Sequence, residues 1–303
     1  MVISFGSINM DVVMRCEHVP AGGETVVSSS WFTNSGGKGA NQAVQAARLG
    51  SRAVLIGRVG ADVFGQQALA SLSASGVNIE GVATDPALPT GIACVLLDRS
   101  GENRIIVAPG ANAAVGVHEL ELLRAALRPG VVLMLQCEIP CDVVFDAARL
   151  GRVAGATVLL DPSPWQSIMV SPGMFADIDY LMPNEAEACG LGGSGNARQA
   201  ADNLLGLGAG TVIVKMGEKG AYVAGAFAKG EVPAFPVPSV DTTAAGDAFQ
   251  GAFASSLEQG FGQESALYRA LAAGALTVTR PGAQQSMPDG GEIEAFLTAR
   301  RSF

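Results

Sequence analysis

The chain has 303 residues, of which 49% are apolar and 16% are charged, and it carries a net charge of −9. This length fits two ordinary domains or one large α/β domain, and the apolar fraction excludes a disordered protein. The excess of acidic residues excludes nucleic acid as a partner, because affinity for a long polyanion rests on Lys and Arg side chains.

Short apolar runs alternate with amphipathic stretches along most of the chain. The runs are rich in Val, Ile and Leu, as strands buried on both faces of a sheet are. They cover residues 2–5, 53–56, 131–135, 158–160, 180–182 and 211–214. Small apolar residues recur at helical spacing in 39–49, and the stretches 196–207 and 247–259 behave similarly. This alternation predicts an α/β fold whose mostly parallel central sheet is flanked by helices.

Two segments interrupt the alternation. In the first, residues 12–34, a turn signal at 20–23 precedes a strand-like run at 24–33. In the second, residues 90–108, the runs 91–98 and 104–107 predict a hairpin around a turn at 99–102. We expect both segments to form a small antiparallel β sheet inserted into one domain that covers residues 1–303, since no linker separates independent units.

Cysteine usage and the N-terminal residues bear on location. The five cysteines are odd in number and scattered, which is typical of thiols in a reducing compartment. The first residues lack a basic segment, and the longest apolar runs are much too short to span a bilayer. We therefore expect a cytoplasmic protein that contacts no membrane. The two histidines lie far apart, so a histidine-based metal or catalytic site is not expected.

A phosphate-binding loop is the natural motif to test in a glycine-rich α/β protein. The sequence S-G-G-K-G at 35–39 fails the Walker pattern, because Gly39 stands where Ser or Thr would follow Lys38. G-x-G-x-x-G does not follow the first strand either, so a dinucleotide fold is not indicated. Two interpretations remain: a plain turn before a helix, or a loop whose Lys38 and Asn41 donate hydrogen bonds to ligand hydroxyl groups.

A second cluster, D-T-T-A-A-G-D-A-F at 241–249, precedes an amphipathic helix. Its small residues leave successive backbone N–H groups free at the helix start, which predicts an anion site. The carboxylate of Asp247 could there take a proton from an attacking hydroxyl group. From the spacing alone the alternative stays open that Asp247 only complements the helix dipole, with Thr242 or Thr243 as the cap.

Seven motifs in order resemble those of the ribokinase (PfkB-type) family of carbohydrate kinases, and the resemblance runs nearly end to end. Beside the cluster at 241–249 they are G-S-I-N-M-D at 6–11, G-G-K-G-A-N-Q-A at 36–43, G-R-V-G-A-D-V-F-G at 57–65, V-A-P-G-A-N at 107–112, Q-C-E-I-P at 136–140 and P-N-E-A-E-A at 183–188. The resemblance implies a three-layer fold in which the inserted β segments close as a lid over a sugar.

The implied activity is transfer of the γ-phosphate of ATP to the 5-hydroxyl of D-ribose, with Mg²⁺ and a monovalent cation, expected to be K⁺. Alternatives within the family are another sugar or a nucleoside, such as fructose, deoxyribose or an adenosine-like compound. A non-catalytic sugar or nucleotide sensor on the same fold is a further alternative. The resemblance also implies a homodimer that forms through the lid.

The resemblance implies a role for each matching position. Asp247 would be the catalytic base, and an anion hole would form from the N–H groups of Ala244, Ala245, Gly246 and Asp247. Sugar hydroxyls would contact Asn9, Asp11, Gly37, Lys38, Asn41, Glu138 and Asp247. The nucleotide would meet Asn184, Glu187, Lys215, Gly217 and Gly220, with Glu187 holding Mg²⁺ through water. The monovalent cation would be held by Asp241 and Ser286.

Three places depart from the family pattern. Lys215 and Met216 stand where a Thr-Leu pair is common, and D-P-S-P at 161–164 replaces the more usual N-P-A-P. The segment 190–195 is short and glycine-rich. These departures leave the nucleotide preference open. The two tryptophans, Trp31 and Trp165, are expected to pack inside the protein.

Overall fold

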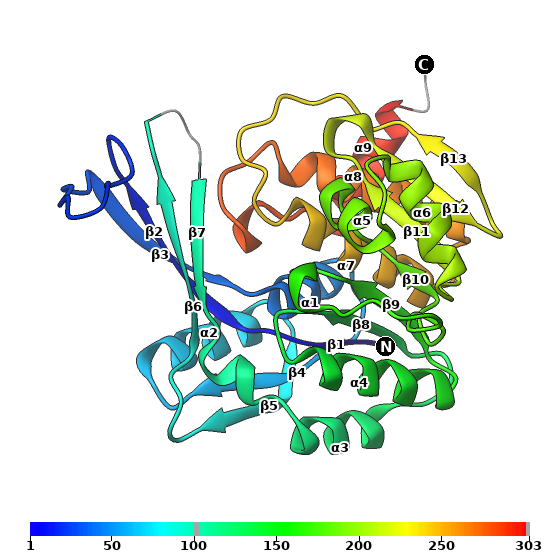
Figure 1. Cartoon of the computed structure of the whole chain (residues 1–303), viewed down its shortest axis with the longest axis horizontal. Coiled ribbons are helices and arrows are strands. Elements are labelled where there is room, and N and C mark those ends of the chain that lie inside the picture. The colour runs from blue at the N-terminus through cyan, green and yellow to red at the C-terminus, as the bar shows by residue number, and fades with distance from the viewer. Residues whose placement is uncertain (100–102, 301–303) are drawn as a thin grey trace.

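The computed structural model describes residues 1–99 and 103–300, which form three layers with a second, smaller sheet at one side (Figure 1). The central sheet has the strand order β13-β12-β11-β10-β9-β8-β1-β4-β5. Its neighbouring strands are parallel, except that β12 is antiparallel to both β11 and β13. Its strands are β1 (Val2–Phe5), β4 (Ala53–Gly60), β5 (Asn78–Asp85), β8 (Val132–Gln136), β9 (Thr157–Asp161), β10 (Tyr180–Leu181), β11 (Thr211–Lys215), β12 (Ala221–Gly225) and β13 (Lys229–Val232).

Helices cover both faces of this sheet. One face carries α3 (Val117–Ala126), α4 (Cys141–Val153), α5 (Glu185–Gly192) and α6 (Ala197–Gly206). The other carries α1 (Lys38–Arg48), α2 (Val63–Ala74), α7 (Ala245–Glu258) and α8 (Gln263–Thr277), with α9 (Gly290–Arg300) against α8. In β1, Ile3 and Phe5 enter the core under the first face, and Val2 enters the core under the second. Burial on both faces is why the central strands are continuous apolar runs.

The structure confirms the expected α/β fold. Each of the six apolar runs coincides with all or part of a central strand. Each of the three amphipathic stretches overlaps a helix, namely α1, α6 or α7. The edge strands β5 and β13, and β12 next to β13, were not predicted. Strand β13 has only exposed and half-buried residues, so its sequence lacks the apolar run that marks a buried strand.

The second sheet, which we call the lid sheet, has the strand order β3-β2-β6-β7 and projects from the body at the left of Figure 1. It consists of β2 (Asn9–Arg15), β3 (Ser30–Gly36), β6 (Gly91–Leu97) and β7 (Asn103–Ala108). The pairs β2–β3 and β6–β7 are antiparallel, and β2 joins β6 in parallel. Most of the turn expected at 99–102 lies outside the described residues.

The strand expected at 24–33 is wrong in its bounds. Strand β2 ends at Arg15, whose partner in β3 is Ser30, so the residues before Ser30 have no strand to pair with. They form a loop instead, in which the carboxylate of Glu24 accepts a hydrogen bond from the backbone N–H of Ala21.

Exposed apolar side chains mark the lid sheet. Trp31 is 68% exposed and Ile106 is 70% exposed, so the expectation that Trp31 packs inside this chain is wrong. Trp165, in contrast, is half-buried against the core under α4 and α5, as expected. The lid sheet therefore exposes large apolar side chains, of the kind that the body of the protein buries.

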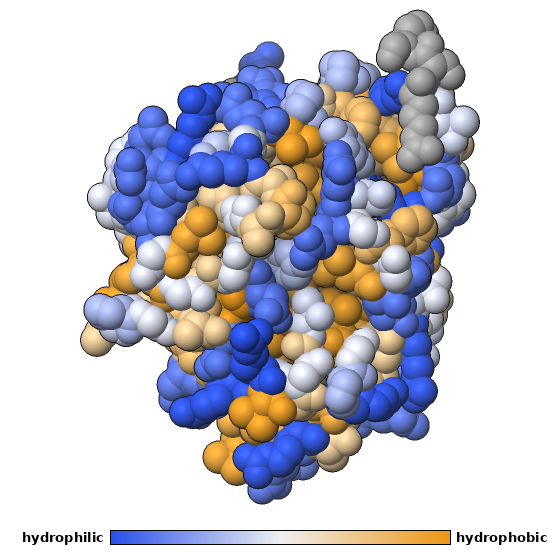
Figure 2. All heavy atoms as spheres, turned by 90° about the vertical axis from the view of Figure 1, so that its right-hand side faces the viewer, coloured by the Kyte–Doolittle hydropathy of each residue, from blue (hydrophilic) through white to orange (hydrophobic). Residues whose placement is uncertain are grey.

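The remaining surface is mixed. Figure 2 shows the face at the right of Figure 1, where hydrophobic patches are separated by hydrophilic side chains. Such a mosaic is ordinary for a folded protein, because more than half of a typical surface is apolar. Within residues 1–99 and 103–300, no helix combines the length and the apolar character needed to cross a membrane.

Gly39 provides a test of how tightly α1 packs on the loop after β1. A Cβ atom on Gly39 would lie 2.6 Å from the backbone carbonyl carbon of Gly6, which cannot rotate away. We expect Gly39→Ala to lower the free energy of unfolding by about 1–3 kcal/mol in urea denaturation. The matched control is Gly206→Ala, since Gly206 is also helical but a Cβ there meets nothing within 4 Å. Equal stability of the two variants would contradict the packing argument.

Candidate active site

An open cleft of about 1450 Å³ lies between the lid sheet, Glu138 after β8, and the loops that contain Asp241 and Gly282. In parallel α/β sheets, ligands bind at the carboxyl ends of the strands, and Glu138 follows such an end. The sequence-predicted residues that line the cleft are Asn9, Asp11, Gly37, Lys38, Asn41, Glu138, Asp241, Ala244 and Asp247. The structure thus brings together residues from all three thirds of the chain.

Asp247 lies in the first turn of α7, only 5% exposed, with both carboxylate oxygens in hydrogen bonds. The side-chain amide of Asn41 donates to Oδ2 at 2.9 Å, and that of Gln42 donates to Oδ1 at 3.2 Å. The ammonium group of Lys38 lies 4.0 Å from Oδ1. Two donors, one on each oxygen, fix the plane of the carboxyl group.

A second pair of amides holds the first. The Gln136 amide donates to Gln42 Oε1 at 2.6 Å, and the Gln284 amide donates to Asn41 Oδ1 at 3.1 Å. Sequence reasoning missed Gln42, Gln136 and Gln284 as parts of the site. A signal existed for Gln42, which occupies a buried helix position inside the motif at 36–43 although long polar side chains are seldom buried.

The start of α7 leaves backbone donors available. Ala244 has φ of 59°, and it is the one non-glycine residue in the described ranges with positive φ. Such a conformation costs of order 1–3 kcal/mol and is found where function constrains the backbone. The N–H of Ala245 donates to the Thr242 carbonyl at 3.3 Å, so it is less available than the sequence implied.

The threonine cap expected in the alternative for Asp247 is wrong. In the described part of the chain no side chain caps α7, and the Thr243 hydroxyl donates to Asp241 instead. The N–H groups of Gly246 and Asp247 at the helix start therefore have no threonine cap. A helix N-terminus in this state attracts anions.

Glu138 lines the same cleft and accepts several hydrogen bonds. Its Oε2 accepts hydrogen bonds from the Ser7 hydroxyl, from the Lys38 backbone N–H at 3.1 Å and from the Asn9 amide at 3.4 Å. Asn9 is held in turn, because the Asn112 amide donates to its Oδ1 at 2.7 Å. These carboxylate and amide groups suit the hydroxyl groups of a small polyol.

Asp11 extends from β2 toward the same space. Burial, reinforced by the negative charges of Glu138 and Asp247, raises its pKa to about 7. The neighbouring glycines make room for it: a Cβ on Gly36 would lie 2.5 Å from the Asp11 carboxylate. Gly37 has φ of 88°, and a Cβ there would lie 2.6 Å from the backbone N of Asn9.

Asp161, at the end of β9, is fully buried and shared by two lysines. Its Oδ2 lies 3.4 Å from Lys38 Nζ and 3.2 Å from Lys215 Nζ. Burial acts to raise the pKa of Asp161, but the charges of Lys215 and Lys38 outweigh it and hold the pKa below its usual range. Sequence reasoning had noted Asp161 only as a departure from the family pattern.

The residues expected at the nucleotide lie next to Lys215. Asn184 caps α5 by accepting from the Glu187 N–H at 2.9 Å, and Glu187 accepts from the Asn184 N–H at 2.8 Å. The backbone of Asn184 also forms an isolated parallel β-bridge with that of Lys215, at the end of β11. Gly217 and Gly220 flank the next turn with φ of 59° and 100°. The capping box gives Asn184 and Glu187 a structural role whatever they bind.

Asp241 and Ser286 lie in two loops that meet at Gly282. Asp241 accepts from the Gly282 N–H at 2.9 Å, and the Ser286 hydroxyl donates to the Gly282 carbonyl at 2.7 Å. Burial would raise the pKa of Asp241, but hydrogen bonds from Thr243 and Gly282 lower it overall. Carboxylate and carbonyl oxygens are suitable ligands for a monovalent cation such as K⁺. Among the described residues, no group of three or more His, Cys, Asp or Glu could hold a metal ion.

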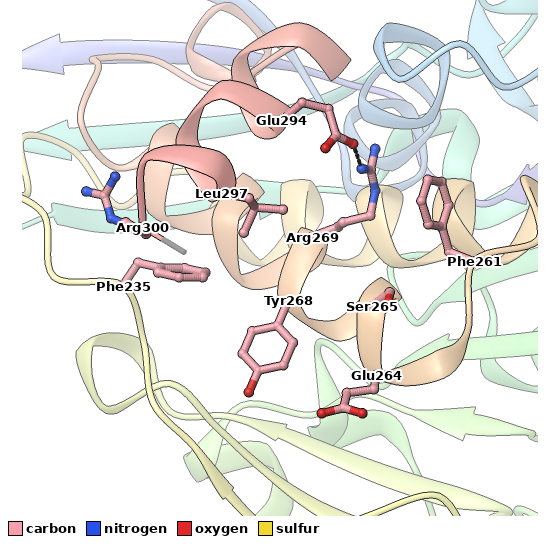
Figure 3. A pocket seen from close by; sticks show the side chains of 9 residues that line it. All are labelled: Phe235, Phe261, Glu264, Ser265, Tyr268, Arg269, Glu294, Leu297 and Arg300. Atoms are coloured by element: carbon pink, nitrogen blue, oxygen red, sulfur yellow. Dashed lines mark hydrogen bonds and ion pairs between the residues drawn. The ribbon is translucent and has the colours of Figure 1, made fainter. Parts of the chain in front are cut away.

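A second cavity, of about 410 Å³, lies between α8 and α9 and contains none of the predicted site residues (Figure 3). Its buried Arg269 already pairs with Glu294 and lies 4.4 Å from the Phe261 ring centre. Its charge is therefore used within the protein, and the cleft at Asp247 remains the candidate site.

The raised pKa of Asp11 predicts a pH-dependent effect on stability. An acid that titrates near 7 when folded and near 4 when unfolded weakens the fold as pH rises between those values. We expect Asp11→Asn to raise the free energy of unfolding above pH 7 by about 1–3 kcal/mol, with the gain vanishing near pH 4. Urea denaturation across that range measures it.

Asp62→Asn is the opposite-sign control. Its carboxylate accepts hydrogen bonds from Thr90 and Gly65, which lower its pKa. This variant should be less stable than the parent at pH 7. A gain for Asp11→Asn that does not change with pH would contradict the assignment to ionisation.

Comparison with known proteins shows which family the chain belongs to. The family model described as pfkB family carbohydrate kinase matches residues 1–290. Ribokinase of Schizosaccharomyces pombe is 35% identical over 99% of both chains, and deoxyribokinase of Salmonella typhi is 33% identical over 97% of both. The structure of Thermotoga maritima ribokinase has a TM-score of 0.90 at 37% identity and covers 98% of this chain and 99% of its own.

A further similar structure is that of Arabidopsis thaliana ribokinase complexed with ribose and ATP. It has a TM-score of 0.86 at 34% identity, and the match covers 98% of both chains. The three-layer body and the smaller lid sheet agree with the fold of these solved structures. The chain belongs to the pfkB family of carbohydrate kinases and is a ribokinase-like phosphotransferase.

Proposed function

We propose that this kinase transfers the γ-phosphate of ATP to the 5-hydroxyl of D-ribose, giving ribose 5-phosphate and ADP. The observation that carries the proposal is Asp247, held by Asn41 and Gln42 beside the uncapped start of α7 and inside the cleft. Ribose as substrate is supported by the ribokinases among the relatives and by the relative described with ribose and ATP.

In the proposed mechanism, the sugar hydroxyls bind to Asn9, Asp11 and Glu138. This contact orients the reacting hydroxyl group toward Asp247, which accepts its proton as the oxygen attacks the phosphorus. The N–H groups at the start of α7 stabilise the charge on the transferring phosphoryl group, and Lys38 adds a positive charge beside it. Closure of the lid sheet excludes water, which would otherwise accept the phosphoryl group.

Two cations complete the proposal. Mg²⁺ would neutralise the phosphates of ATP, with Glu187 holding its waters and Asn184 beside it. K⁺ would be held by Asp241 and by the loop that contains Ser286, which suits the oxygen-rich loops that meet at Gly282. Gly217 and Gly220 would let the backbone approach the nucleotide closely.

2-Deoxyribose is the second candidate substrate, because a deoxyribokinase is among the relatives at 33% identity. The two sugars differ by one hydroxyl group. A site built to bond that hydroxyl discriminates against the sugar that lacks it, whereas an open site accepts both.

The exposed apolar residues of the lid sheet support a homodimer formed through it. Ile105, Ile106 and Val107 of β7 are 54%, 70% and 48% exposed, and Trp31 of β3 is 68% exposed. Aromatic and aliphatic residues of this kind are typical of interfaces between subunits. All five cysteines are thiols and not disulfides, which supports the proposed cytoplasmic location.

A coupled ADP-release assay tests the reaction and its base. We expect ribose to exceed 2-deoxyribose in kcat/KM by at least about tenfold, and Asp247→Asn to lower kcat by about 10²–10⁴-fold. Asp142→Asn is the matched control, since Asp142 is an exposed acid in the first turn of α4. A higher kcat/KM for 2-deoxyribose would overturn ribose as the substrate, and full activity of Asp247→Asn would overturn the base.

The dimer is tested by mass in solution. We expect light scattering to give twice the chain mass for the parent, and the chain mass for Ile106→Lys, because a buried unpaired charge opposes association. Val153→Lys is the control, since Val153 is 83% exposed on α4, far along the chain from the lid sheet. A monomeric parent would contradict the proposal.

A further inference from the structure

Two of the departures from the family pattern contact each other. Asp161 and Lys215 were noted separately in the sequence, 54 positions apart, and their side chains form an ion pair of 3.2 Å. Asp161 is at the end of β9 and Lys215 at the end of β11. Both side chains are charged, whereas the family pattern that the sequence resembles has the uncharged residues Asn and Thr at these positions.

Asp161 and Lys215 do not form an isolated ion pair, because Asp161 also contacts Lys38. Asp161 has no exposed surface, and its Oδ2 serves both Lys215 and Lys38. Its Oδ1 is buried and accepts no hydrogen bond from any residue that the structure describes. Lys38 has a further carboxylate partner, because its ammonium group also lies 4.0 Å from Asp247 Oδ1. Among the ion pairs of residues 1–99 and 103–300, Lys215 has only its share of Asp161. In a largely dehydrated place, an ammonium group that shares one carboxylate favours an anion as a further partner.

The position of the second ammonium group says where that anion would be. A methyl group added to Gly246 would lie 3.5 Å from Lys215 Nζ. Lys215 therefore stands over the backbone of the residue before Asp247, at the uncapped start of α7. Lys38 stands on the other side of Asp161, 4.0 Å from the carboxylate of Asp247. One ammonium group is thus near Asp247 and the other near Gly246, and both contact the same oxygen of Asp161.

We propose that Lys215 is a second phosphate-binding cation, whose ammonium group contacts the terminal phosphoryl group as it passes to the sugar, and that Asp161 is the residue that positions it. The proposal rests on the kinase activity proposed above and adds to it a residue beyond the backbone N–H groups and Lys38. A lysine here acts as a point charge with three donors, which suits phosphate oxygens whose charge spreads during transfer.

A structural interpretation competes with this proposal. In that interpretation Lys215 serves only as counter-ion to a buried carboxylate, and neutralising both partners would cost little, because buried ion pairs are often replaceable by uncharged groups. The double variant Asp161→Asn/Lys215→Thr separates the two interpretations, since it restores the uncharged residues that are common at both positions.

We expect the double variant to unfold at a temperature close to that of the parent while its kcat stays about 10–100-fold lower. Lys215→Met alone should show a similar loss in kcat. Lys219→Met is the matched control, because Lys219 is an exposed lysine of the next turn that pairs with Glu185. A double variant that recovers the parent kcat would overturn the proposal and leave Lys215 as a counter-ion.

A binding measurement without sugar tests the same contact and does not depend on which sugar is phosphorylated. Calorimetry with Mg²⁺ and either ADP or a non-hydrolysable ATP analogue gives the affinity for each nucleotide. We expect the double variant to lose about tenfold affinity for the triphosphate and little for ADP, since only the triphosphate reaches Lys215. Equal losses for both nucleotides, or none, would overturn the proposal even if ribose proves to be the substrate.

Discussion

The contact between α1 and α7 is the constraint on which the site depends. Helix α1 supplies Asn41 and Gln42, which hold both oxygens of Asp247 at the start of α7. The two helices pack closely because Gly251 of α7 lies against Gln42 and Gln45 of α1, where a Cβ would lie 2.7 Å from the Gln42 carbonyl oxygen. A carboxylate aimed by helices in a packed core keeps its orientation without a ligand, so little reorganisation is needed when the phosphoryl group arrives.

The charged side chains of the site are also held in fixed positions, close to one another. The chain is acidic overall, yet Lys38 and Lys215 are concentrated on the buried Asp161, beside the free N–H groups of α7. Burial acts to lower the pKa of Lys38, but the surrounding carboxylates outweigh it and hold that pKa above its usual range. Net charge governs the distant field, whereas these fixed local charges govern the site. The acidic side of the cleft, with Asp11 and Glu138, suits the hydroxyl groups of a sugar, and the basic side suits phosphate.

The central sheet and the lid sheet differ in burial, and each contributes residues to the site. The central sheet is buried on both faces and supplies the ends of β8, β9 and β11, from which Glu138, Asp161 and Lys215 extend. The lid sheet is a four-stranded flap that carries Asn9 and Asp11 and keeps apolar residues exposed. An element with few buried contacts can move at low cost, which is what opening and closing over a substrate requires.

Sequence alone determined the architecture and most of the site. Apolar runs without alternation specify strands buried on both faces, and the ordered motifs at 6–11, 36–43 and 241–249 contain residues that meet in one cleft. The edge strand β13 and the start of β3 escaped prediction, because an exposed strand lacks an apolar run and its bounds depend on its partner. The pairing of Asp161 with Lys215, the amide contacts of Gln136 and Gln284, and the lack of a threonine cap on α7 were decided only by the tertiary structure. Each of these is a contact between side chains, or a backbone conformation, that residues distant in the chain impose on one another.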